Sequence, residues 1–206
     1  MEDIILVGFG GHAKSVIDSI DQNDEYHIIG YTDIKYQNKY RDYQYLGCDK
    51  VLQEYYDRGV KFAFVTVGYM GKSKLRDVLY KQLKKIGFFI PSIIDRTAVL
   101  AKDIMIGEGT FIGKNCVVNS ASQIGKMCIL NTGAIIEHEN WIGDFTHISV
   151  NSTLCGNVFA DSHCFIGSNT TVIQNIRIGS DSVIGAGSVV LRNILPGETV
   201  YGIVKN

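Results

Sequence analysis

The chain has 206 residues, 46% of them apolar, and a formal charge of −1 at pH 7. This length suits one large domain or two small ones, and the near-neutral charge excludes a general attraction to nucleic acid or to an anionic membrane. No apolar run approaches the roughly 18 residues that span a bilayer. The start MEDIILVGFGG lacks the basic residues of a signal peptide, so we expect a cytoplasmic protein.

The first 94 residues alternate between strand-like and helix-like segments. Apolar runs predict strands at 4–7, 27–32, 61–67 and 88–94. Amphipathic patterns predict helices at 12–20 and 73–87, and the second ends at a glycine. Its apolar face would carry Leu75, Val78, Leu79 and Leu83. Strands that alternate with helices indicate an α/β domain with a small parallel, Rossmann-like sheet.

A glycine-rich turn joins the first predicted strand to the first predicted helix. Its sequence, GFGGHA at 8–13, fits the G-x-G-x-x-G/A pattern that lets a backbone approach a phosphate at a helix N-terminus. Asp33 follows the second strand, where a carboxylate can accept ribose hydroxyls. About four strands leave room for one mononucleotide unit and not for the two halves that NAD requires, so we predict a single-nucleotide site. The alternative is that the glycines only make a tight turn, which His12 caps.

From residue 94 the apolar pattern has a period of six. Of the 17 positions reached in steps of six from Ile94 to Val190, all but Ala160 are Ile, Leu or Val, although these make up only 56 of the 206 residues. The third residue after each aliphatic is often Gly, Asn or Asp, which tolerate the positive φ of a corner. A six-residue repeat with turn residues at fixed offsets predicts a parallel β-helix whose coils must stack to bury their apolar residues.

The fourth residue after each aliphatic is usually small, and three of the five cysteines occupy this position. We expect Cys116, Cys128 and Cys164 to be small buried residues. No C-x-x-C pair occurs, and an odd number of cysteines in a cytoplasmic chain argues against a disulfide framework. We therefore expect no metal site.

The repeats resemble those of the left-handed β-helix hexapeptide acyltransferases. Together, GFGGHA at 8–13 and EHENWIGDFTHI at 137–148 resemble the bacterial sugar acetyltransferases of the sialic-acid O-acetyltransferase type. That family includes N-acetyltransferases that act on nucleotide-linked 4-amino-4,6-dideoxysugars. The resemblance implies a nucleotide-sugar-binding domain at 1–93 and a left-handed β-helix at 94–206 that binds acetyl-CoA and ends in a closing strand. It also implies a homotrimer with active sites between subunits.

The resemblance assigns roles to individual residues. His138 and Glu139 match the catalytic histidine and the glutamate beside it. The residues that match nucleotide-sugar contacts are Gly8, Gly10, Gly11, His12, Asp33, Gly68 and Arg76, with Thr32 in place of a first acid. The residues that match acetyl-CoA or active-site contacts are Asn131, His147, Gly156, Ser168, Ala186 and Lys205; the end of the chain, GIVK, lacks the proline usual in the family.

The residues themselves support His138 as a base. Acetyl transfer to an amine needs a group that removes a proton, and an imidazole gains and loses protons near neutral pH. His138 falls at a coil corner, beside Glu139, which replaces the usual Gly or Asn. Three sides of six residues make an 18-residue coil, so His138 should stack over Gly156, whose N–H could meet the thioester oxygen.

The sequence is also compatible with two other functions. The acceptor could be a hydroxyl of sialic acid or another sugar, because an alcohol needs the same base. The β-helix could also be a non-enzymatic scaffold or a metal-binding protein like the γ-class carbonic anhydrases. The last needs three converging histidines, and His138, His147 and His163 occupy different positions of the repeat.

Overall fold

The chain folds into two compact units in the computed structural model, which describes residues 1–37 and 40–205. The first unit comprises Met1–Gly68 and Lys74–Ile93, and the second comprises Tyr69–Ser73 and Ile94–Asn206. The short segment Tyr69–Ser73 therefore belongs with the second unit although its flanking residues belong to the first.

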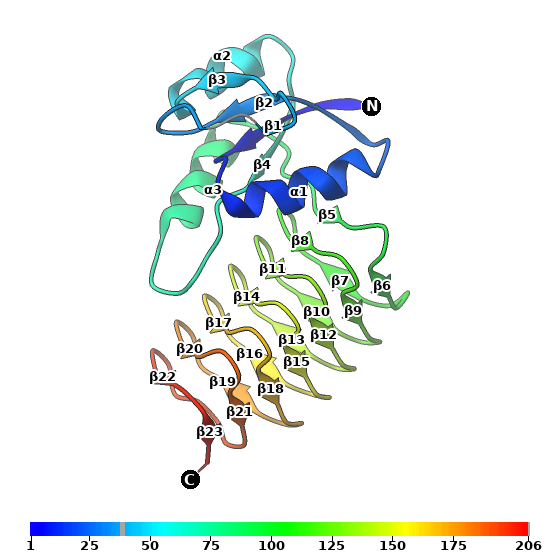
Figure 1. Cartoon of the computed structure of the whole chain (residues 1–206), viewed down its shortest axis with the longest axis vertical. Helices are drawn as coiled ribbons and strands as arrows, with labels where there is room; N and C mark the ends of the chain where they lie inside the picture. The colour runs from blue at the N-terminus through cyan, green and yellow to red at the C-terminus, as the bar shows by residue number, and fades with distance from the viewer. Residues whose placement is uncertain (38–39, 206) are drawn as a thin grey trace. The chain divides into compact units, whose positions relative to one another are not determined.

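The first unit is built on a parallel four-stranded sheet in the order β3-β2-β1-β4 (Figure 1). Its strands are β1 (Glu2–Val7), β2 (Tyr26–Thr32), β3 (Tyr45–Gly47) and β4 (Phe62–Val65). Its helices are α1 (Gly11–Asp21), η1 (Asp49–Val51), α2 (Leu52–Asp57) and α3 (Leu75–Ile86). The four residues from Ile4 to Val7 are at most 1% exposed, as expected for a strand covered on both faces.

The sequence placed the fourth strand of this sheet wrongly. The predicted strand at 88–94 meets this sheet only through an isolated bridge between Phe89 and Phe62, and its last two residues form the strand β5 (Ile93–Ile94) of the second unit. The fourth strand of the sheet is instead the short β3. Pro91 has no N–H to donate and restricts the residue before it, which explains why pairing stops there. The predicted apolar face of α3 is only partly buried, because Leu75 and Val78 are 46% and 58% exposed.

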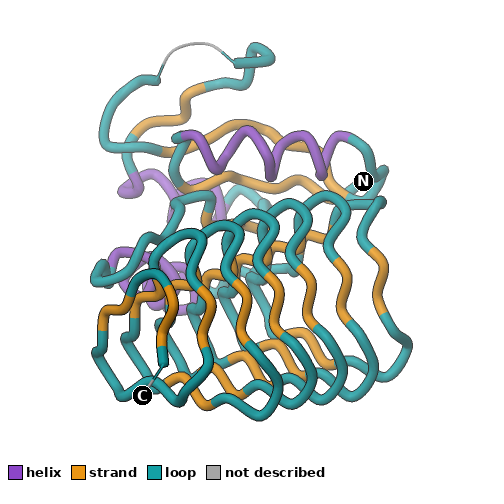
Figure 2. Tube along the Cα trace, turned by 60° about the horizontal axis from the view of Figure 1, so that its bottom comes forward, coloured by secondary structure: helices purple, strands orange, loops and turns teal. Residues whose placement is uncertain are grey.

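The second unit is a left-handed parallel β-helix with three flat sheets of two-residue strands (Figures 1 and 2). We name these three sheets B, C and D, after the sheet of the first unit, which is sheet A. Sheet B contains β5 (Ile93–Ile94), β8 (Phe111–Ile112), β11 (Ile129–Leu130), β14 (His147–Ile148), β17 (Phe165–Ile166), β20 (Val183–Ile184) and β22 (Thr199–Val200). Sheet C contains β6 (Val99–Leu100), β9 (Val117–Val118), β12 (Ile135–Ile136), β15 (Thr153–Leu154), β18 (Thr171–Val172), β21 (Val189–Val190) and β23 (Ile203–Val204). Sheet D contains β7 (Met105–Ile106), β10 (Gln123–Ile124), β13 (Trp141–Ile142), β16 (Phe159–Ala160) and β19 (Arg177–Ile178).

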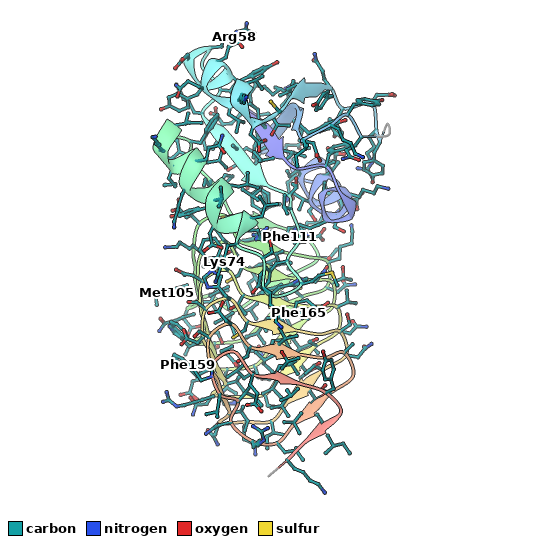
Figure 3. The ribbon with its side chains drawn as sticks, turned by 90° about the vertical axis from the view of Figure 1, so that its left-hand side faces the viewer. Arg58, Lys74, Met105, Phe111, Phe159 and Phe165 are labelled. Atoms are coloured by element: carbon teal, nitrogen blue, oxygen red, sulfur yellow. The ribbon has the colours of Figure 1, made fainter. Side chains whose placement is uncertain are left out.

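The second residue of each strand points inward and the first points outward. From Ile112 to Val190 these inward residues are at most 3% exposed. The outward ones form ladders, and in sheet D the rings of Trp141 and Phe159 stack with centroids 4.2 Å apart. Met105 and Phe159 of this sheet lie along one edge in Figure 3, away from Phe111 and Phe165 of sheet B.

The corners have the left-handed backbone conformation that the repeat predicts. Asparagines at this position, such as Asn151 and Asn157, have φ of 54° and 56°. Five residues that are not Gly, Asn or Asp adopt the same conformation, at a cost of roughly 1–2 kcal/mol each. They are Ala121, Met127, Glu139, Phe145 and His163. Glu139 therefore shares its departure from the turn pattern with four other corners, and that departure alone does not mark a functional position.

The inward cysteines are structural, as predicted. Cys116, Cys128 and Cys164 are fully buried, and their thiols donate to backbone carbonyls. Burial raises the pKa of the Cys116 thiol to about 11 and that of Cys164 to about 12. These two thiols are therefore protonated at neutral pH and unsuited to nucleophilic chemistry.

The alternation of inward and outward residues gives a test of the β-helix core. Ile124 is 3% exposed inside the prism, whereas the preceding Gln123 of β10 is exposed. Ile124→Ala should lower the free energy of unfolding by about 2–5 kcal/mol, because it leaves a cavity between coils. Gln123→Ala, the matched control, should change it by about 0.5 kcal/mol or less. Urea unfolding of both variants measures the difference, and equal midpoints would contradict the inward assignment.

Candidate functional site

His138 and Glu139 lie together at the corner between β12 and β13. The His138 Nδ1 atom is 3.0 Å from Glu139 Oε2, and the two side chains are 60% and 64% exposed. A carboxylate only accepts, so Nδ1 carries the proton when the imidazole is neutral and Nε2 is then an acceptor. The left-handed corner, with φ of 60° at Glu139, returns these two adjacent side chains to the same side. The result is an oriented imidazole with its basic nitrogen accessible.

The imidazole of His138 lies over Gly156 of the next coil, as the 18-residue register predicts. A Cβ atom at Gly156 would lie 2.5 Å from His138 Cε1 and 2.6 Å from Nε2, so any side chain there would displace the ring. The backbone of the following residue, Asn157, donates to the His138 carbonyl at 2.9 Å and fixes the stacking. Among residues 1–37 and 40–205, no acceptor is bonded to the Gly156 N–H. A free backbone donor therefore lies beside the basic nitrogen.

His147 and Asn131 form a second cluster, on sheet B and the corner that follows it. His147 is only 8% exposed, and its Nδ1 atom is 2.5 Å from the carbonyl oxygen of Tyr69. A carbonyl only accepts, so Nδ1 carries the proton and Nε2 faces the Asn131 amide at 3.5 Å. The Tyr69 hydroxyl in turn donates to the His163 carbonyl at 2.7 Å. The segment Tyr69–Ser73 thus fixes the tautomer of His147 within the second unit.

The remaining residues assigned to coenzyme A are spread along the β-helix. Ser168 is half-buried at the corner after sheet B, where its Oγ is 2.9 Å from that of Ser149. Ala186 is exposed one coil further on, and Gly167 lets its backbone approach closely. Lys205 is exposed just after the closing strand β23. Asn131, His147, Ser168 and Ala186 therefore share one side of the prism, and His138 lies at a different corner of the same chain.

The three glycines of the turn have different surroundings: Gly8 is closely packed, whereas Gly10 and Gly11 face open space. Gly8 has φ of 95°, and a Cβ there would lie 2.6 Å from Val67 Cγ2, so packing alone requires glycine. Gly10 caps α1, and neither it nor Gly11 has an atom within 4 Å of the Cβ position. The tight-turn explanation accounts for Gly8, whereas open space at the start of a helix is what an incoming phosphate needs. His12 lies in the first turn of α1, and its Nε2 is buried.

Asp33 lines a small cavity beside this turn. Its carboxylate accepts from the N–H of Phe9 at 2.9 Å and from that of Ile34 at 2.7 Å, which ties the end of β2 to the glycine turn. The cavity of about 90 Å³ is lined by Val7, Gly8, Asp33, Ile34, Asp49, Val67, Leu75 and Leu79. Its walls are mostly apolar with two carboxylates, which suits a flat heterocycle with polar edges.

The second carboxylate of this cavity was missed from the sequence. Thr32 is fully buried, and its hydroxyl donates to Asp49 Oδ1 at 2.6 Å. Asp49 thus supplies a carboxylate beside Thr32, the residue that stands in place of the first of the two adjacent acids in the resembling family. It comes from the 3₁₀ turn η1, and no local pattern in the sequence marks that turn as part of the site. Only the tertiary contact reveals it.

Gly68 and Arg76 lie near the glycine turn in different ways. The position for a Cβ on Gly68 is 3.8 Å from His12 Cβ, so the loop after β4 approaches the first turn of α1. Arg76 is 2% exposed, and its guanidinium donates to the carbonyls of Val65 and Val67, the latter at 2.5 Å. In this position Arg76 holds the end of β4 and the following Val67, which lines the cavity.

Within residues 1–37 and 40–205, no group of three His, Cys, Asp or Glu side chains could hold a metal ion. None of the helices in these ranges is both long and apolar enough to cross a membrane.

Comparison with known families agrees with this two-part architecture. Residues 3–83 match the PglD N-terminal domain. Residues 103–137 match the hexapeptide repeat of succinyl-transferase, and residues 162–192 match the bacterial transferase hexapeptide.

Similar solved structures cover almost the whole chain. The GDP-perosamine N-acetyltransferase of Caulobacter crescentus, a histidine mutant in complex with CoA and GDP-perosamine, is 28% identical. The match covers 98% of this chain and 94% of that chain, with a TM-score of 0.92. The acetyltransferase domain of PglB from Neisseria gonorrhoeae, also solved with acetyl coenzyme A, is 26% identical. It covers 98% of this chain and 97% of that one, with a TM-score of 0.88.

These matches confirm the resemblance to sugar acetyltransferases that the sequence predicts. The PglD domain accounts for the small sheet with the glycine turn, and the hexapeptide repeats account for the β-helix. The chain is an acetyltransferase whose residues 3–83 match the PglD N-terminal domain and whose β-helix matches hexapeptide repeats of bacterial transferases.

Proposed function

We propose that this chain transfers the acetyl group of acetyl-CoA to the amino group of a nucleotide-linked 4-amino-4,6-dideoxy sugar, with His138 as the general base. The observation that carries the proposal is the imidazole of His138, oriented by Glu139 and lying over the side-chain-free backbone of Gly156. The similar Caulobacter enzyme binds CoA and GDP-perosamine, and the similar PglB domain binds acetyl coenzyme A. Both support the substrate classes.

The reaction follows from the acceptor and donor atoms at this corner. The sugar amine attacks the thioester carbonyl carbon while His138 Nε2 takes a proton from the nitrogen. The oxygen of the tetrahedral intermediate gains negative charge and receives a hydrogen bond from the Gly156 N–H. The intermediate collapses by breaking the carbon–sulfur bond, and the imidazolium returns its proton to the leaving thiolate. The products are the N-acetyl sugar and free CoA, and no acyl-enzyme forms.

The first unit would hold the nucleotide of the sugar substrate. Gly10 and Gly11 leave space for the diphosphate at the start of α1, whose N-terminus favours negative charge. Asp33 and Asp49 offer acceptors for ribose hydroxyls or for N–H groups of a base. We assign His12 and Gly68 to the same nucleotide loops, and Arg76 to their support.

The acetyl-CoA site would form between two copies of the chain in a homotrimer. His138 lies at the corner after sheet C, whereas Asn131, His147, Ser168 and Ala186 lie on sheet B or the corner after it. One side of the prism separates the two groups, roughly 16–20 Å for five or six extended residues. A closed ring of three parallel prisms would bring the His138 corner of one copy to the sheet B side of the next. Lys205 at the end of the chain could then meet a phosphate of CoA.

Replacement of His138 tests the base. His138→Ala should lower kcat by about 100- to 10,000-fold, because the amine then loses its proton acceptor, and should leave the oligomeric state unchanged. Glu139→Gln keeps the geometry but removes the charge, and it should cause a smaller loss. The assay mixes the protein with acetyl-CoA and a panel of UDP-, dTDP- and GDP-linked amino sugars and of sialic acid. A 42 Da gain marks each acetylated product. Turnover of the alanine variant close to wild type would rule out the mechanism.

Gly10 and Gly8 provide a matched test of the nucleotide loop. Gly10→Ala projects a methyl group into open space, so stability should fall by only about 1 kcal/mol or less, the difference between Gly and Ala at an N-cap, while nucleotide binding weakens by about tenfold or more. Gly8→Ala should instead destabilise the fold by about 1–3 kcal/mol, because of its φ and the contact with Val67. Calorimetric titration with UDP, dTDP and GDP measures binding, and thermal unfolding measures stability. Unchanged affinity in Gly10→Ala would favour the explanation that the glycines only make a turn.

Mixed oligomers test whether the site is shared between copies. His138→Ala and Asn131→Ala should each be slow alone. Co-expressed in equal amounts, they should recover roughly a quarter of wild-type activity, since one interface in four then joins an intact His138 to an intact Asn131. Activity no higher than the mean of the two separate variants would contradict a shared site.

A further inference from the structure

The inner corner position of the β-helix normally carries a small residue that joins successive coils. At this position Thr110 donates to the carbonyl of Gly125 at 2.8 Å, Thr146 to that of Asp161 at 2.9 Å, and Ser152 to that of Gly167 at 2.7 Å. In each pair the acceptor is 15 residues further along the chain, at the adjoining corner of the next coil. A single hydroxyl or thiol is therefore sufficient for the structural task.

Asn140 occupies this inner position at the His138 corner. It is 1% exposed, and it is the only asparagine at the inner corner positions between 98 and 194. Its Nδ2 group donates to the Cys155 carbonyl at 3.0 Å, which is the same 15-residue contact. The same group also donates to the Glu137 carbonyl at 2.6 Å and lies 3.5 Å from that of His138. One amide thus ties the His138 peptides to the neighbouring coil.

The contact with Cys155 bears directly on the proposed oxyanion donor. The carbonyl of Cys155 and the N–H of Gly156 belong to one planar peptide group. A donor bonded to that carbonyl fixes the plane of the peptide and so the direction in which the Gly156 N–H points. It also polarises the peptide, which strengthens the N–H as a donor. The contact with Glu137 fixes the peptide that leads into His138 in the same way.

The choice of asparagine has a cost that the structural role does not require. The Oδ1 atom of Asn140 is buried, and it has no hydrogen-bond partner within residues 1–37 and 40–205. A buried acceptor without a partner costs about 1–3 kcal/mol. The Ser, Thr and Cys residues at other inner corners leave no such oxygen. An amide is kept where the fold alone would favour a hydroxyl.

We propose that Asn140 is a positioning residue that holds the His138 peptide and the Gly156 N–H in the geometry for acetyl transfer. This inference rests on the proposed function, since it concerns the same corner. Asn140 does not touch the substrates. It acts through two backbone carbonyls, one in the coil of the base and one in the coil of the oxyanion donor.

Asn140→Ser tests the proposal. A serine hydroxyl can keep the ordinary inner contact with the Cys155 carbonyl, but it loses the contact with the Glu137 carbonyl and removes the buried Oδ1 atom. We expect kcat for the amino-sugar acceptor to fall about 10- to 100-fold, with KM for both substrates within about threefold of wild type. The unfolding midpoint should be equal to that of wild type or higher. Thr110→Val is the matched control at an inner corner far from His138 along the chain, and it should lower stability without lowering kcat.

The outcomes separate this inference from the proposed function. Absence of transfer by the wild-type protein across the acceptor panel refutes the function. If the wild-type protein and Asn140→Ser transfer acetyl with the same kcat, the positioning role is refuted. It is also refuted if the variant loses kcat together with stability and shows a higher KM. A second measurement needs no turnover: in protein labelled with ¹⁵N-glycine, Asn140→Ser should shift the Gly156 amide signal and Thr110→Val should not. An unmoved Gly156 signal also overturns the inference.

Discussion

The 18-residue register between coils is the constraint on which the site depends. Backbone bonds such as Glu137 N–H to Leu154 and Asn157 N–H to His138, both 2.9 Å, repeat at fixed intervals along the prism. They place each residue above the residue 18 positions later, so the partner of His138 is set by the ladder and not by local flexibility. One inserted residue between these positions would bring a bulkier side chain under the imidazole. The position of the proposed base over Gly156 is in this sense a property of the backbone repeat.

The regular repeat made the second half of the fold predictable. Each aliphatic, corner and small position could be assigned from one period, because every coil solves the same packing problem and the bonds join residues at a constant separation. The first unit was less predictable for the opposite reason. The strand β3 (Tyr45–Gly47) is short and has no alternating pattern. The segment 88–94 looks like one strand, but it pairs with the first sheet only at Phe89, before Pro91, and its last two residues join the β-helix as β5. Tertiary contacts, not local preference, decide which of the two completes the sheet.

In the candidate site, too, some features follow from the repeat and others depend on tertiary contacts. The stacking of His138 over Gly156 follows from counting, and its contact with Glu139 follows from the corner. Two other features could not be predicted by counting residues along the repeat. Asp49 accepts a hydrogen bond from Thr32 beside the cavity, and the carbonyl of Tyr69 fixes the tautomer of His147. Both contacts join segments far apart in the sequence. The corner rule itself was a poor guide to function, since a strained corner at Phe145 has the same φ as Glu139 to within a degree.

A prism without loops limits how a site can be made. No insertion leaves the repeat between residues 94 and 190, so the reactive groups have to come from corners, strand faces and the backbone itself. Short side chains at one corner cannot reach another, which is why the proposed acetyl-CoA site needs a second copy of the chain. The same limit explains why fine positioning would come from inside: from the prism interior, a side chain such as Asn140 reaches the backbone carbonyls of two successive coils at once. Inner corners that lack a small residue otherwise carry Ile or Val, which suit the apolar interior, so a buried amide at this position is a more specific sign of function than an unusual residue on the outer side.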